Sequence, residues 1–502
     1  MTLADVIRTV PPGATPATSG PHAGDQPITQ IAYDSRQVRP GAVFVALHGL
    51  KDDGTRYVPQ AVSRGAVAVV SEAPCPEGFD QAWIPTDNAR LAIALLADRF
   101  YDSPSRRMPV IGVTGTNGKT TTGYLLAAIL DAAGMKAGLL GTVSYRVGQV
   151  ERGAARTTPE STDVQALLAE MIDHGCRSAV MEVSSHALAL RRVDGMRFAA
   201  GVFTNLTRDH LDFHGDMEAY FAAKRRLFEM LEADAPGIIN LDDPRGVQLR
   251  AACQRQFTYG ITQAADVMPA DLVMSLSGLQ CTLQTPAGAI AVRSSLVGRP
   301  NVYNILAAAA TAVALGVSPD AIARGIAALP GVPGRFEVVS SPEDDVTVVV
   351  DYAHTDDALR NLLETARPLA SKRLITVFGC GGDRDRTKRP LMGMVATRLS
   401  DVVIITSDNP RSEEPGRIIE DIRRGITPDG KGQRHSEVTA MDDRAAAIAR
   451  AVAMATPGDL VLVAGKGHEK TQEIGGVVLP FDDVAVSRDA LAARRARKGR
   501  TL

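Results

Sequence analysis

The sequence predicts an α/β fold of more than one domain, with sheets that are mostly parallel. A chain of 502 residues, 45% hydrophobic and 22% charged, is globular in composition but too long for one hydrophobic core. From Met108 onward, short apolar runs rich in β-branched residues alternate with helical stretches, the order typical of parallel sheets covered by helices. The runs are apolar almost throughout, as expected for strands buried on both faces.

Composition and spacing divide the chain into three blocks. Residues 1–100 hold two apolar runs, AVFVALHG and AVAVVSE, and end before YDSPSRRMP, a stretch expected to be a linker. Residues 101–332 contain the strand-like runs VIGVTG, AGLLGTV, SAVMEVSS, AGVFTNL and GIINLDD. Between about 271 and 296 the pattern shortens to alternating segments, which predict antiparallel hairpins. Residues 333–502 repeat the α/β order with VTVVVDYAH, LITVFGCGG, VVIITSDNP and LVLVAGKG.

Charge and cysteine content exclude several classes of protein. The net charge of −2 gives no reason to expect a nucleic-acid partner. The five cysteines are scattered and form neither a disulfide framework nor a CxxC metal pattern. No signal-peptide pattern opens the sequence, and the longest apolar run is too short to span a bilayer. We expect a cytoplasmic, monomeric protein with no membrane insertion.

The segment GVTGTNGKTTT, Gly112 to Thr122, predicts a phosphate-binding loop between a strand and a helix. Only the second half of the usual GxxxxGK[ST] pattern is present. Gly115 and Gly118 allow backbone N–H groups to approach a phosphate at the helix N-terminus. Lys119 could reach phosphate oxygens and the Thr120 hydroxyl could bind Mg²⁺. The alternative is a tight turn that carries an incidental lysine.

Further polar segments follow the predicted strands, where ligands of parallel sheets bind. They are EVSSH, TNLTRDH, DYAHT, GCGGDRDR, SDNPR and AGKGHE. Glu182 ends a strand and suits a divalent cation, which needs several oxygen ligands, although it could instead cap the next helix. Lys224 lies among three basic residues of one predicted helix, and its spacing alone favours a solvated charged face.

The set of motifs resembles the Mur ligase family. GTNGKT, EVSSHAL, TNLTRDHLDFHG, NVYNILAA, DYAHT, GCGGDRDRTKRP, DNPR and GKGHE occur in that order, between the YDSR motif at Tyr33 and the end of GKGHE. The resemblance implies an N-terminal UDP-sugar-binding domain, a central P-loop ATPase domain and a C-terminal Rossmann-like domain for the amino acid. It also explains the short phosphate loop, because the family uses GTNGKT in place of the full pattern.

The motifs DNPR and GKGHE imply the reaction. This would be ATP-dependent addition of meso-2,6-diaminopimelate to the D-Glu of UDP-N-acetylmuramoyl-L-alanyl-D-glutamate, in peptidoglycan biosynthesis. Such an activity serves cell-wall biogenesis and thus cell shape, cell division and the cell cycle. Mg²⁺ would be the cofactor and ATP the co-substrate.

The resemblance also implies residue roles, by motif. The ATP site would comprise Gly115, Thr116, Asn117, Gly118, Lys119, Thr120, Thr121, Asn301, Asn304, Arg335 and Asp351. The UDP-muramoyl dipeptide would contact Tyr33, Ser35, Thr157, Thr158, Ser184 and Arg192. Diaminopimelate would contact Arg384, Asp408, Asn409, Pro410, Arg411, Gly465 and Glu469. The catalytic set would be Lys119, Glu182, His210 and Lys224, and the metal set Thr120, Glu182, His210 and Lys224 as a carbamate.

Two positions depart from the family pattern. The family often has Gln where this chain has Leu190, which weakens any expected hydrogen bond there. DYAHT is usually followed by Pro and here by Asp356, which could change the start of the next helix without removing Asp351 or His354 from the site.

The DNPR motif would form a turn and could also bind diaminopimelate. This substrate differs from lysine by a carboxylate on its far carbon, which Arg411 can bind through two parallel N–H bonds, with Arg384 as a second contact. Glu469 could accept the far ammonium. Two alternative functions are a folylpolyglutamate synthase, which shares the ATPase core, and a non-catalytic nucleotide switch. YDSR and DNPR argue against the first, and the complete set of motifs against the second.

Overall fold

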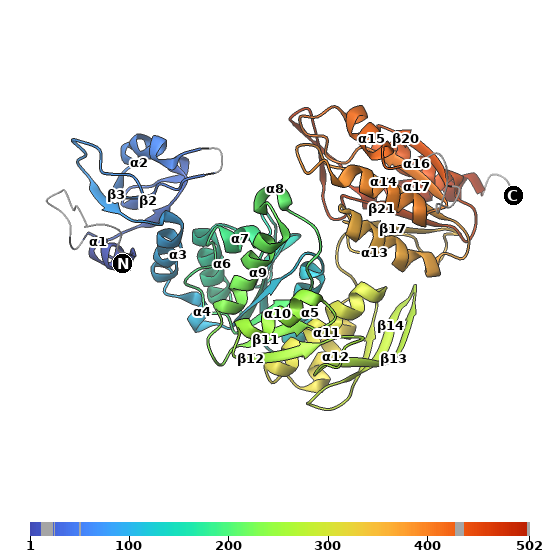
Figure 1. Ribbon diagram of the computed structural model, residues 1–502, viewed down its shortest axis with the longest axis horizontal. Helices are drawn as coiled ribbons and strands as arrows, with labels where there is room; N and C mark the ends of the chain where they lie inside the picture. The colour runs from blue at the N-terminus through green and yellow to red at the C-terminus, as the bar shows by residue number, and fades with distance from the viewer. Residues whose placement is uncertain (12–23, 25, 50–51, 427–435, 499–502) are drawn as a thin grey trace.

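The computed structural model describes residues 1–11, 24, 26–49, 52–426 and 436–498. Three α/β domains follow one another along the chain, each with its own main sheet, which confirms the expected fold class. The N-terminal domain (blue) and the C-terminal domain (orange) lie on either side of the central domain (Figure 1).

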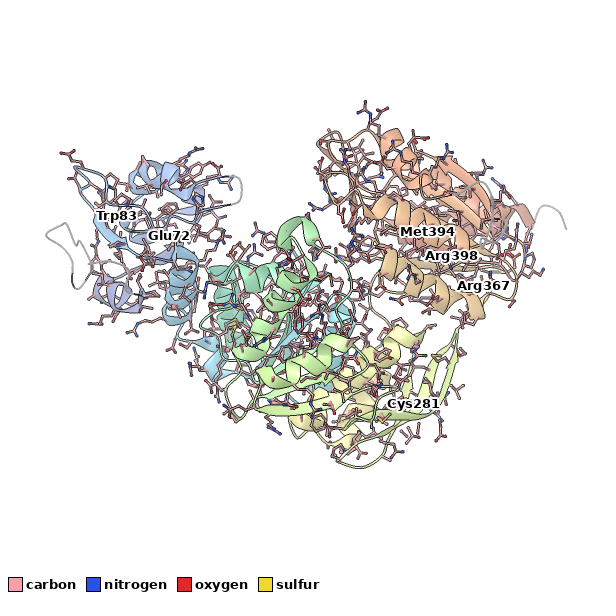
Figure 2. The ribbon with its side chains drawn as sticks, viewed as in Figure 1. Glu72, Trp83, Cys281, Arg367, Met394 and Arg398 are labelled. Atoms are coloured by element: carbon pink, nitrogen blue, oxygen red, sulfur yellow. The ribbon has the colours of Figure 1, made fainter. Side chains whose placement is uncertain are left out.

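The N-terminal domain is a four-stranded parallel sheet in the order β1-β2-β3-β4. The strands are β1 (Gln30–Ala32), β2 (Ala42–Val45), β3 (Ala66–Ser71) and β4 (Ala82–Pro85), and the helices are α1 (Leu3–Thr9), α2 (Val58–Ser63) and α3 (Ala89–Phe100). The predicted runs AVFVALHG and AVAVVSE contain β2 and β3, whereas β1 and β4 stand in no apolar run of that length. The buried Trp83 of β4 anchors one face of this sheet (Figure 2).

The segment expected to be a linker joins the first two domains and contains a short helix, α4 (Pro104–Arg107). Proline suits the first position of a helix because its missing N–H would have no partner there. Ser105 is buried and accepts a hydrogen bond from the backbone N–H of Arg197, so the connection is packed against the central domain.

The central domain is an eight-stranded sheet in the order β12-β11-β10-β5-β9-β6-β7-β8. Its strands are β5 (Val110–Thr114), β6 (Ala137–Leu140), β7 (Ser144–Val147), β8 (Val150–Gly153), β9 (Ser178–Glu182), β10 (Ala200–Phe203), β11 (Pro236–Asn240) and β12 (Arg255–Tyr259). Pairing is parallel except at the β6-β7-β8 edge. Alternate residues of each inner strand pack into two separate cores, which explains why the runs are apolar throughout.

Helices cover both faces of this sheet. On one face lie α5 (Lys119–Ala132), α11 (Arg299–Ala314) and α12 (Pro319–Ala328), and on the other lie α6 (Ser161–Asp173) and α9 (Met217–Glu229). Three shorter helices are α7 (Ser185–Ala189), α8 (Leu211–His214) and α10 (Pro244–Leu249).

The predicted hairpins form a separate three-stranded antiparallel sheet. Its strands are β13 (Met268–Ser275), β14 (Gly278–Gln284) and β15 (Ile290–Ser294). Cys281 of β14, labelled in Figure 2, is one of the residues through which this sheet joins the core around α11 and α12.

The C-terminal domain is a six-stranded sheet in the order β16-β17-β21-β18-β19-β20. The strands are β16 (Glu337–Val338), β17 (Thr347–Asp351), β18 (Leu374–Phe378), β19 (Val402–Thr406), β20 (Glu437–Met441) and β21 (Leu460–Ala464), and a hairpin adds β22 (Thr471–Ile474) and β23 (Val477–Pro480). The helices are α13 (Asp356–Ala366), α14 (Lys388–Leu399), α15 (Pro415–Arg423), α16 (Arg444–Met454) and α17 (Asp483–Lys498). All pairs in the sheet are parallel except β16-β17.

Asp356 does not disturb the helix that follows DYAHT. Helix α13 begins at Asp356, and the Thr355 hydroxyl caps it by accepting from the backbone N–H of Ala358. Two acidic residues in the first turn favour the positive end of the helix dipole.

The strand order brings the polar segments together. In the central sheet β10, β5 and β9 are neighbours, so TNLTRDH, GTNGKT and EVSSH leave the same edge side by side. In the C-terminal sheet β17, β21, β18 and β19 are neighbours, so DYAHT, GKGHE, GCGGDRDR and SDNPR do the same. Within the described parts of the chain, no helix is long and apolar enough to cross a membrane.

Candidate active site

The loop between β5 and α5 has the geometry of a phosphate-binding loop. Gly115 and Gly118 have φ values of 146° and 86°, which L side chains rarely adopt. A Cβ at Gly115 would lie 1.9 Å from Thr204 Oγ1, and one at Gly118 would lie 2.4 Å from Asn304 Oδ1. The first N–H groups of a helix have no helical partner, and within the described part of the chain no side chain caps those of α5, so they fit an anion such as a phosphate.

The segment that follows β10 holds the loop in shape. The N–H of Thr116 donates to the Asn205 carbonyl oxygen (2.9 Å), and that of Asn117 donates to Asn205 Oδ1 (2.9 Å). The Thr116 hydroxyl and the Tyr220 hydroxyl are 3.1 Å apart. These contacts fix the loop before any ligand is bound.

Lys119 and Lys224 meet at this loop. The Lys119 ammonium donates to the carbonyl oxygens of Gly115 and Thr116, both at 2.9 Å. The Lys224 ammonium donates to the same Gly115 oxygen at 2.8 Å and lies 4.5 Å from the centre of the Tyr220 ring. Lys224 is 1% exposed, so the solvated charged face that its spacing favoured is wrong. Burial, and then the positive charge of Lys119, hold the pKa of Lys224 well below its ordinary value.

Residues of α11 pack directly on the loop. The Asn304 side chain accepts from the Thr122 hydroxyl (3.4 Å) and donates to Asn301 Oδ1 (2.9 Å). Asn301 in turn donates to the Val297 carbonyl oxygen (2.8 Å). The structure therefore places both asparagines, together with the buried Thr120 and Thr121, beside the phosphate loop.

Arg335 connects the start of the C-terminal domain with the loop. Its guanidinium donates to the Thr120 hydroxyl (3.1 Å) and lies 4.6 Å from the centre of the Tyr352 ring. Asp351, at the end of β17, accepts from the backbone N–H groups of Phe336 (2.7 Å) and Ala353 (2.8 Å). Asp351 thereby fixes the turn that carries Arg335.

Glu182 is buried at the end of β9 and accepts from the backbone N–H and hydroxyl of Thr142, at 2.8 and 3.0 Å. It does not cap the next helix: Ser184 does, by accepting from the backbone N–H of Ala187. The capping alternative for Glu182 is therefore wrong.

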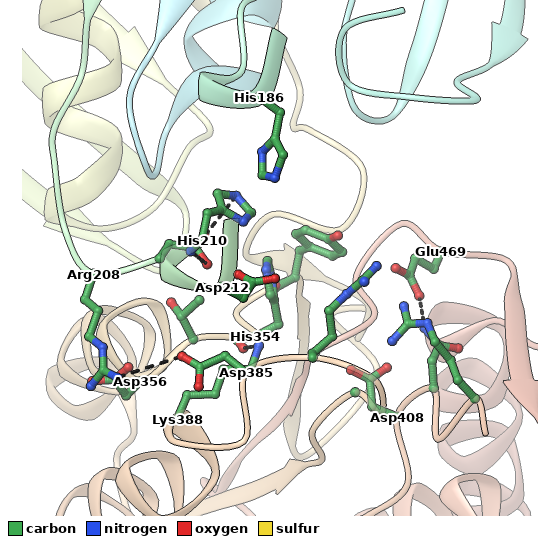
Figure 3. A pocket seen from close by; sticks show the side chains of 18 residues that line it. His186, Arg208, His210, Asp212, His354, Asp356, Asp385, Lys388, Asp408 and Glu469 are labelled. Atoms are coloured by element: carbon green, nitrogen blue, oxygen red, sulfur yellow. Dashed lines mark hydrogen bonds and ion pairs between the residues drawn. The ribbon is translucent and has the colours of Figure 1, made fainter. Parts of the chain in front are cut away.

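His210 lies on the neighbouring loop, with its ring 4.8 Å from that of His186 and its Nε2 atom 3.3 Å from an Asp209 carboxylate oxygen (Figure 3). Burial lowers the pKa of His210, which favours the neutral imidazole that a metal ion would need. Among the residues with described positions, no group of three or more His, Cys, Asp or Glu side chains is arranged to hold a metal ion. A cation here would thus need hydroxyl, carbamate or phosphate oxygens besides Glu182 and His210.

The candidate residues for the sugar nucleotide fall into two groups. In the central domain the Thr158 hydroxyl lies 3.3 Å from Ser184 Oγ, and Arg192 donates to the Thr158 carbonyl oxygen (3.0 Å). The Thr157 hydroxyl is 3.0 Å from that of Thr142, which joins this group to Glu182. Tyr33 and Ser35 belong to the N-terminal domain. The Tyr33 hydroxyl donates a hydrogen bond to Asp163 of the central domain (2.9 Å). Ser35 is buried, and its hydroxyl donates to the Gln60 side chain within the N-terminal domain.

A pocket of about 310 Å³ lies between the two sets of strand ends (Figure 3). Its walls include the predicted residues Arg384, Asp408, Asn409, Arg411, Gly465 and Glu469. From the central domain it is lined by the segment that carries Asp209 and His210. The pocket thus joins the expected amino-acid site to the loop beside the phosphate site.

Arg411 has an unusual conformation for an arginine, with φ 54°. Its backbone N–H donates to the Glu473 carbonyl oxygen (3.0 Å), and its guanidinium donates to the Gly382 carbonyl oxygen (2.7 Å). Pro410 precedes it, and the Pro410 carbonyl oxygen accepts from the backbone N–H of Glu413 (3.0 Å). DNPR is therefore a tight turn, as expected, and the turn directs Arg411 to the pocket wall.

Sequence reasoning missed several residues of this pocket as site members: His186, Arg208, Asp209, Lys388 and the neighbouring Lys466. The guanidinium of Arg208 donates to the Thr387 hydroxyl (2.7 Å). It also lies 3.8 Å from an Asp385 carboxylate oxygen (Figure 3), so it links the central and C-terminal domains. Lys388 donates to the His354 carbonyl oxygen (2.8 Å). The position of His186, Arg208, Asp209 and Lys466 soon after buried strands was a usable signal, because such loops share one edge of a sheet. Lys388 begins helix α14 and carried no such signal.

The glycine loop before α5, the pocket between the strand ends and the three main sheets are typical of a three-domain α/β nucleotide-binding enzyme. Models of Mur ligase domains match the chain in order: "Mur ligase family, catalytic domain" over residues 27–101, "Mur ligase middle domain" over 113–312 and "Mur ligase, glutamate ligase domain" over 334–467. The chain belongs to the Mur ligase family.

Similar proteins cover nearly the whole chain. A UDP-N-acetylmuramoyl-L-alanyl-D-glutamate--2,6-diaminopimelate ligase of Solibacter usitatus is 47% identical over 98% of this chain and 98% of its own length. The protein of the same name from Geobacter metallireducens is 50% identical over 91% of this chain and 92% of its own. A solved structure of a ligase with this name has a TM-score of 0.66 and 36% identity, covering 94% of this chain and 96% of that chain.

Proposed function

We propose that this protein is an ATP-dependent ligase that joins meso-2,6-diaminopimelate to the D-Glu of UDP-N-acetylmuramoyl-L-alanyl-D-glutamate. The observation that carries the proposal is the pocket shared by the loop beside the phosphate site and the Arg411 turn. The names of the relatives, which match this chain over nine-tenths of their length or more, support the same activity. The reaction would contribute to peptidoglycan biosynthesis, and so to cell-wall biogenesis, cell shape, cell division and the cell cycle.

Amide formation from a carboxylate and an amine requires activation of the carboxylate. The γ-carboxylate of D-Glu attacks the γ-phosphorus of ATP, the bond to the bridging oxygen breaks, and ADP leaves. The amine of diaminopimelate then attacks the acyl phosphate, and the tetrahedral intermediate expels inorganic phosphate and loses a proton. Catalysis of this kind rests mainly on positioning and on offsetting charge at the transferred phosphoryl group.

Lys119 would supply that positive charge. Its ammonium is held by the Gly115 and Thr116 carbonyl oxygens at the mouth of the loop, within reach of a phosphate bound at the helix N-terminus. Thr120, Glu182, His210 and a carbamate on Lys224 would hold Mg²⁺, which when bound neutralises phosphate charge. Burial of Lys224 and its lowered pKa support the carbamate, because only a neutral amine reacts with CO₂.

The domain roles follow the family. Residues 1–100, with Tyr33 and Ser35, would bind the uridine nucleotide, and Thr157, Thr158, Ser184 and Arg192 would bind the muramoyl dipeptide. Residues 101–332 would bind ATP, with Asn301, Asn304, Arg335 and Asp351 beside the loop. Residues 333–502 would bind diaminopimelate, with Arg411 and Arg384 on its far carboxylate and Glu469 on its far ammonium. We expect a cytoplasmic monomer with small-molecule substrates and no nucleic-acid partner.

A coupled ADP-release assay tests the function. UDP-muramoyl dipeptide and ATP are supplied with diaminopimelate, lysine or no amino acid. We expect ADP release with diaminopimelate and little with lysine. Release with a folate and glutamate in their place would favour a folylpolyglutamate synthase, and ATP binding without turnover would favour a nucleotide switch.

A further inference from the structure

A fully buried lysine, Lys466, lies behind the wall of the amino-acid pocket. It sits between Gly465 and Gly467, directly after the buried strand β21, and is 0% exposed. Its ammonium donates to Glu469 Oε2 and to Asn409 Oδ1, each at 2.9 Å. A lysine is rarely buried this deeply unless its charge is paired, and these two contacts supply the pairing.

Asn409 belongs to the same hydrogen-bond network as Lys466 and Glu469. Its side-chain oxygen also accepts from the backbone N–H of Glu473 (3.1 Å), and its Nδ2 atom donates to Glu469 Oε2 (2.8 Å). Two donors therefore fix one oxygen of the Glu469 carboxylate, while Glu469 itself lines the pocket with its side chain 30% exposed. Lys466 and Asn409 set the orientation of the carboxylate that faces the pocket.

The charges of this wall do not cancel. Asp408 lies 3.7 Å from the Lys466 ammonium, and its Oδ1 atom is buried with no hydrogen-bond partner among the described residues. The nearby guanidinium of Arg444 is paired with Asp483 at 2.7 and 2.8 Å. One ammonium thus faces two carboxylates, which leaves a negative charge on the same wall as Arg411, whose guanidinium lies 3.6 Å from the more exposed Glu473. That combination suits a carbon that bears both an ammonium and a carboxylate.

We propose that Lys466 is a positioning residue for amino-acid selection: it fixes Glu469 and Asn409 so that the wall accepts the ammonium next to the carboxylate that Arg411 binds. The proposal rests on the proposed function, since it assigns the pocket to the amino-acid substrate. Removing the Lys466 charge leaves Asn409 as the remaining one of the two donors on Glu469 and places two unbalanced carboxylates together.

The test compares Lys466→Met, Glu469→Gln and the double variant with the wild-type enzyme. We expect Lys466→Met to raise the KM for diaminopimelate about tenfold or more and to leave the KM values for ATP and the UDP-muramoyl dipeptide within about twofold, since a lost hydrogen bond to a charged group corresponds to such a factor. Because Lys466 acts through Glu469, the double variant should be little worse than the worse single variant.

Lys470→Met is the matched control, because Lys470 is 61% exposed and pairs with Asp482, outside the pocket. Lys466→Gln, which keeps a hydrogen-bond donor, should lie between the wild type and Lys466→Met, and it replaces Lys466→Met if that variant does not fold. Equal increases in all three KM values would overturn the proposal. So would a KM for diaminopimelate in the double variant that rises by the product of the two single-variant factors. Absence of turnover with diaminopimelate in the wild type would instead count against the proposed function.

Discussion

The ammonium groups of Lys119 and Lys224 share one acceptor, the carbonyl oxygen of Gly115, at 2.9 and 2.8 Å. The two lysines come from different helices, one at the start of α5 and one inside α9. Two positive charges this close repel each other, and both side chains have a lowered pKa, with burial as the main cause. An anionic phosphate, or conversion of one lysine into an anion, would relieve this repulsion.

Lys119→Ala is expected to abolish ligase turnover, reducing it to less than a few per cent, because it removes the charge that would face the transferred phosphoryl group. The fold should persist, since the side chain contributes hydrogen bonds to the loop and little apolar packing. ADP release and circular dichroism measure the two effects. Lys136→Ala is the control, because Lys136 donates to the His174 carbonyl oxygen away from the loop. Turnover comparable to wild type in Lys119→Ala would contradict the loop assignment.

Lys224→Ala is expected to be inactive and to regain part of its activity when short carboxylates such as acetate or formate are added, if a carbamate is the working group. Mass spectrometry of the intact protein in bicarbonate should show the added CO₂ on the wild type alone. As the pH falls through the lowered pKa, the ammonium form returns and the carbamate should be lost. A free amine under saturating bicarbonate would rule out the carbamate and leave the rest of the site standing.

Gly118→Ala is expected to weaken ATP binding at least tenfold. The added Cβ would lie 2.4 Å from Asn304 Oδ1, and the left-handed backbone would cost a further ~1 kcal/mol. Calorimetric titration with a non-hydrolysable ATP analogue gives the affinity. Gly153→Ala on β8 is the control, because a Cβ there meets nothing within 4 Å. Unchanged affinity in Gly118→Ala would mean that phosphates bind elsewhere.

Arg411→Ala is expected to raise the KM for diaminopimelate strongly and to narrow its preference over lysine. The guanidinium would pair with a carboxylate that lysine lacks, and a partly buried charge left without that partner would cost ~1–3 kcal/mol. The maximal ADP-release rate at saturating diaminopimelate should fall much less. Arg384→Ala should act in the same direction. An unchanged ratio of the two substrates' kcat/KM values would show that selectivity arises elsewhere in the C-terminal domain.

The sequence by itself determined the order of the inner strands and most of the motifs, but not the edge strands such as β8, β12 and β20. Apolar runs predicted the inner strands because parallel strands are buried on both faces. The glycines of GTNGKT predicted a tight loop, and Gly115 and Gly118 do have the positive φ values that favour glycine. Alternating segments predicted the β13-β14-β15 sheet. The edge strands β1 and β4 were missed because neither stands in a long apolar run such as those that contain β2 and β3.

Tertiary structure decided which polar residues meet and which charges are buried. Lys224 shares helical spacing with the buried Tyr220 and Leu227 of α9, so periodicity alone was compatible with burial. The partner of its ammonium, the Gly115 carbonyl oxygen, lies 109 residues away in sequence and is supplied only by the tertiary structure. Likewise, the position of Lys466 between two glycines gives no sign of burial. The sheet order β17-β21-β18-β19 brings the end of β21 near the end of β19, which leads into DNPR. A sequence pattern records local spacing, whereas the free energy of a buried charge depends on partners that only the packed sheets bring within 3 Å.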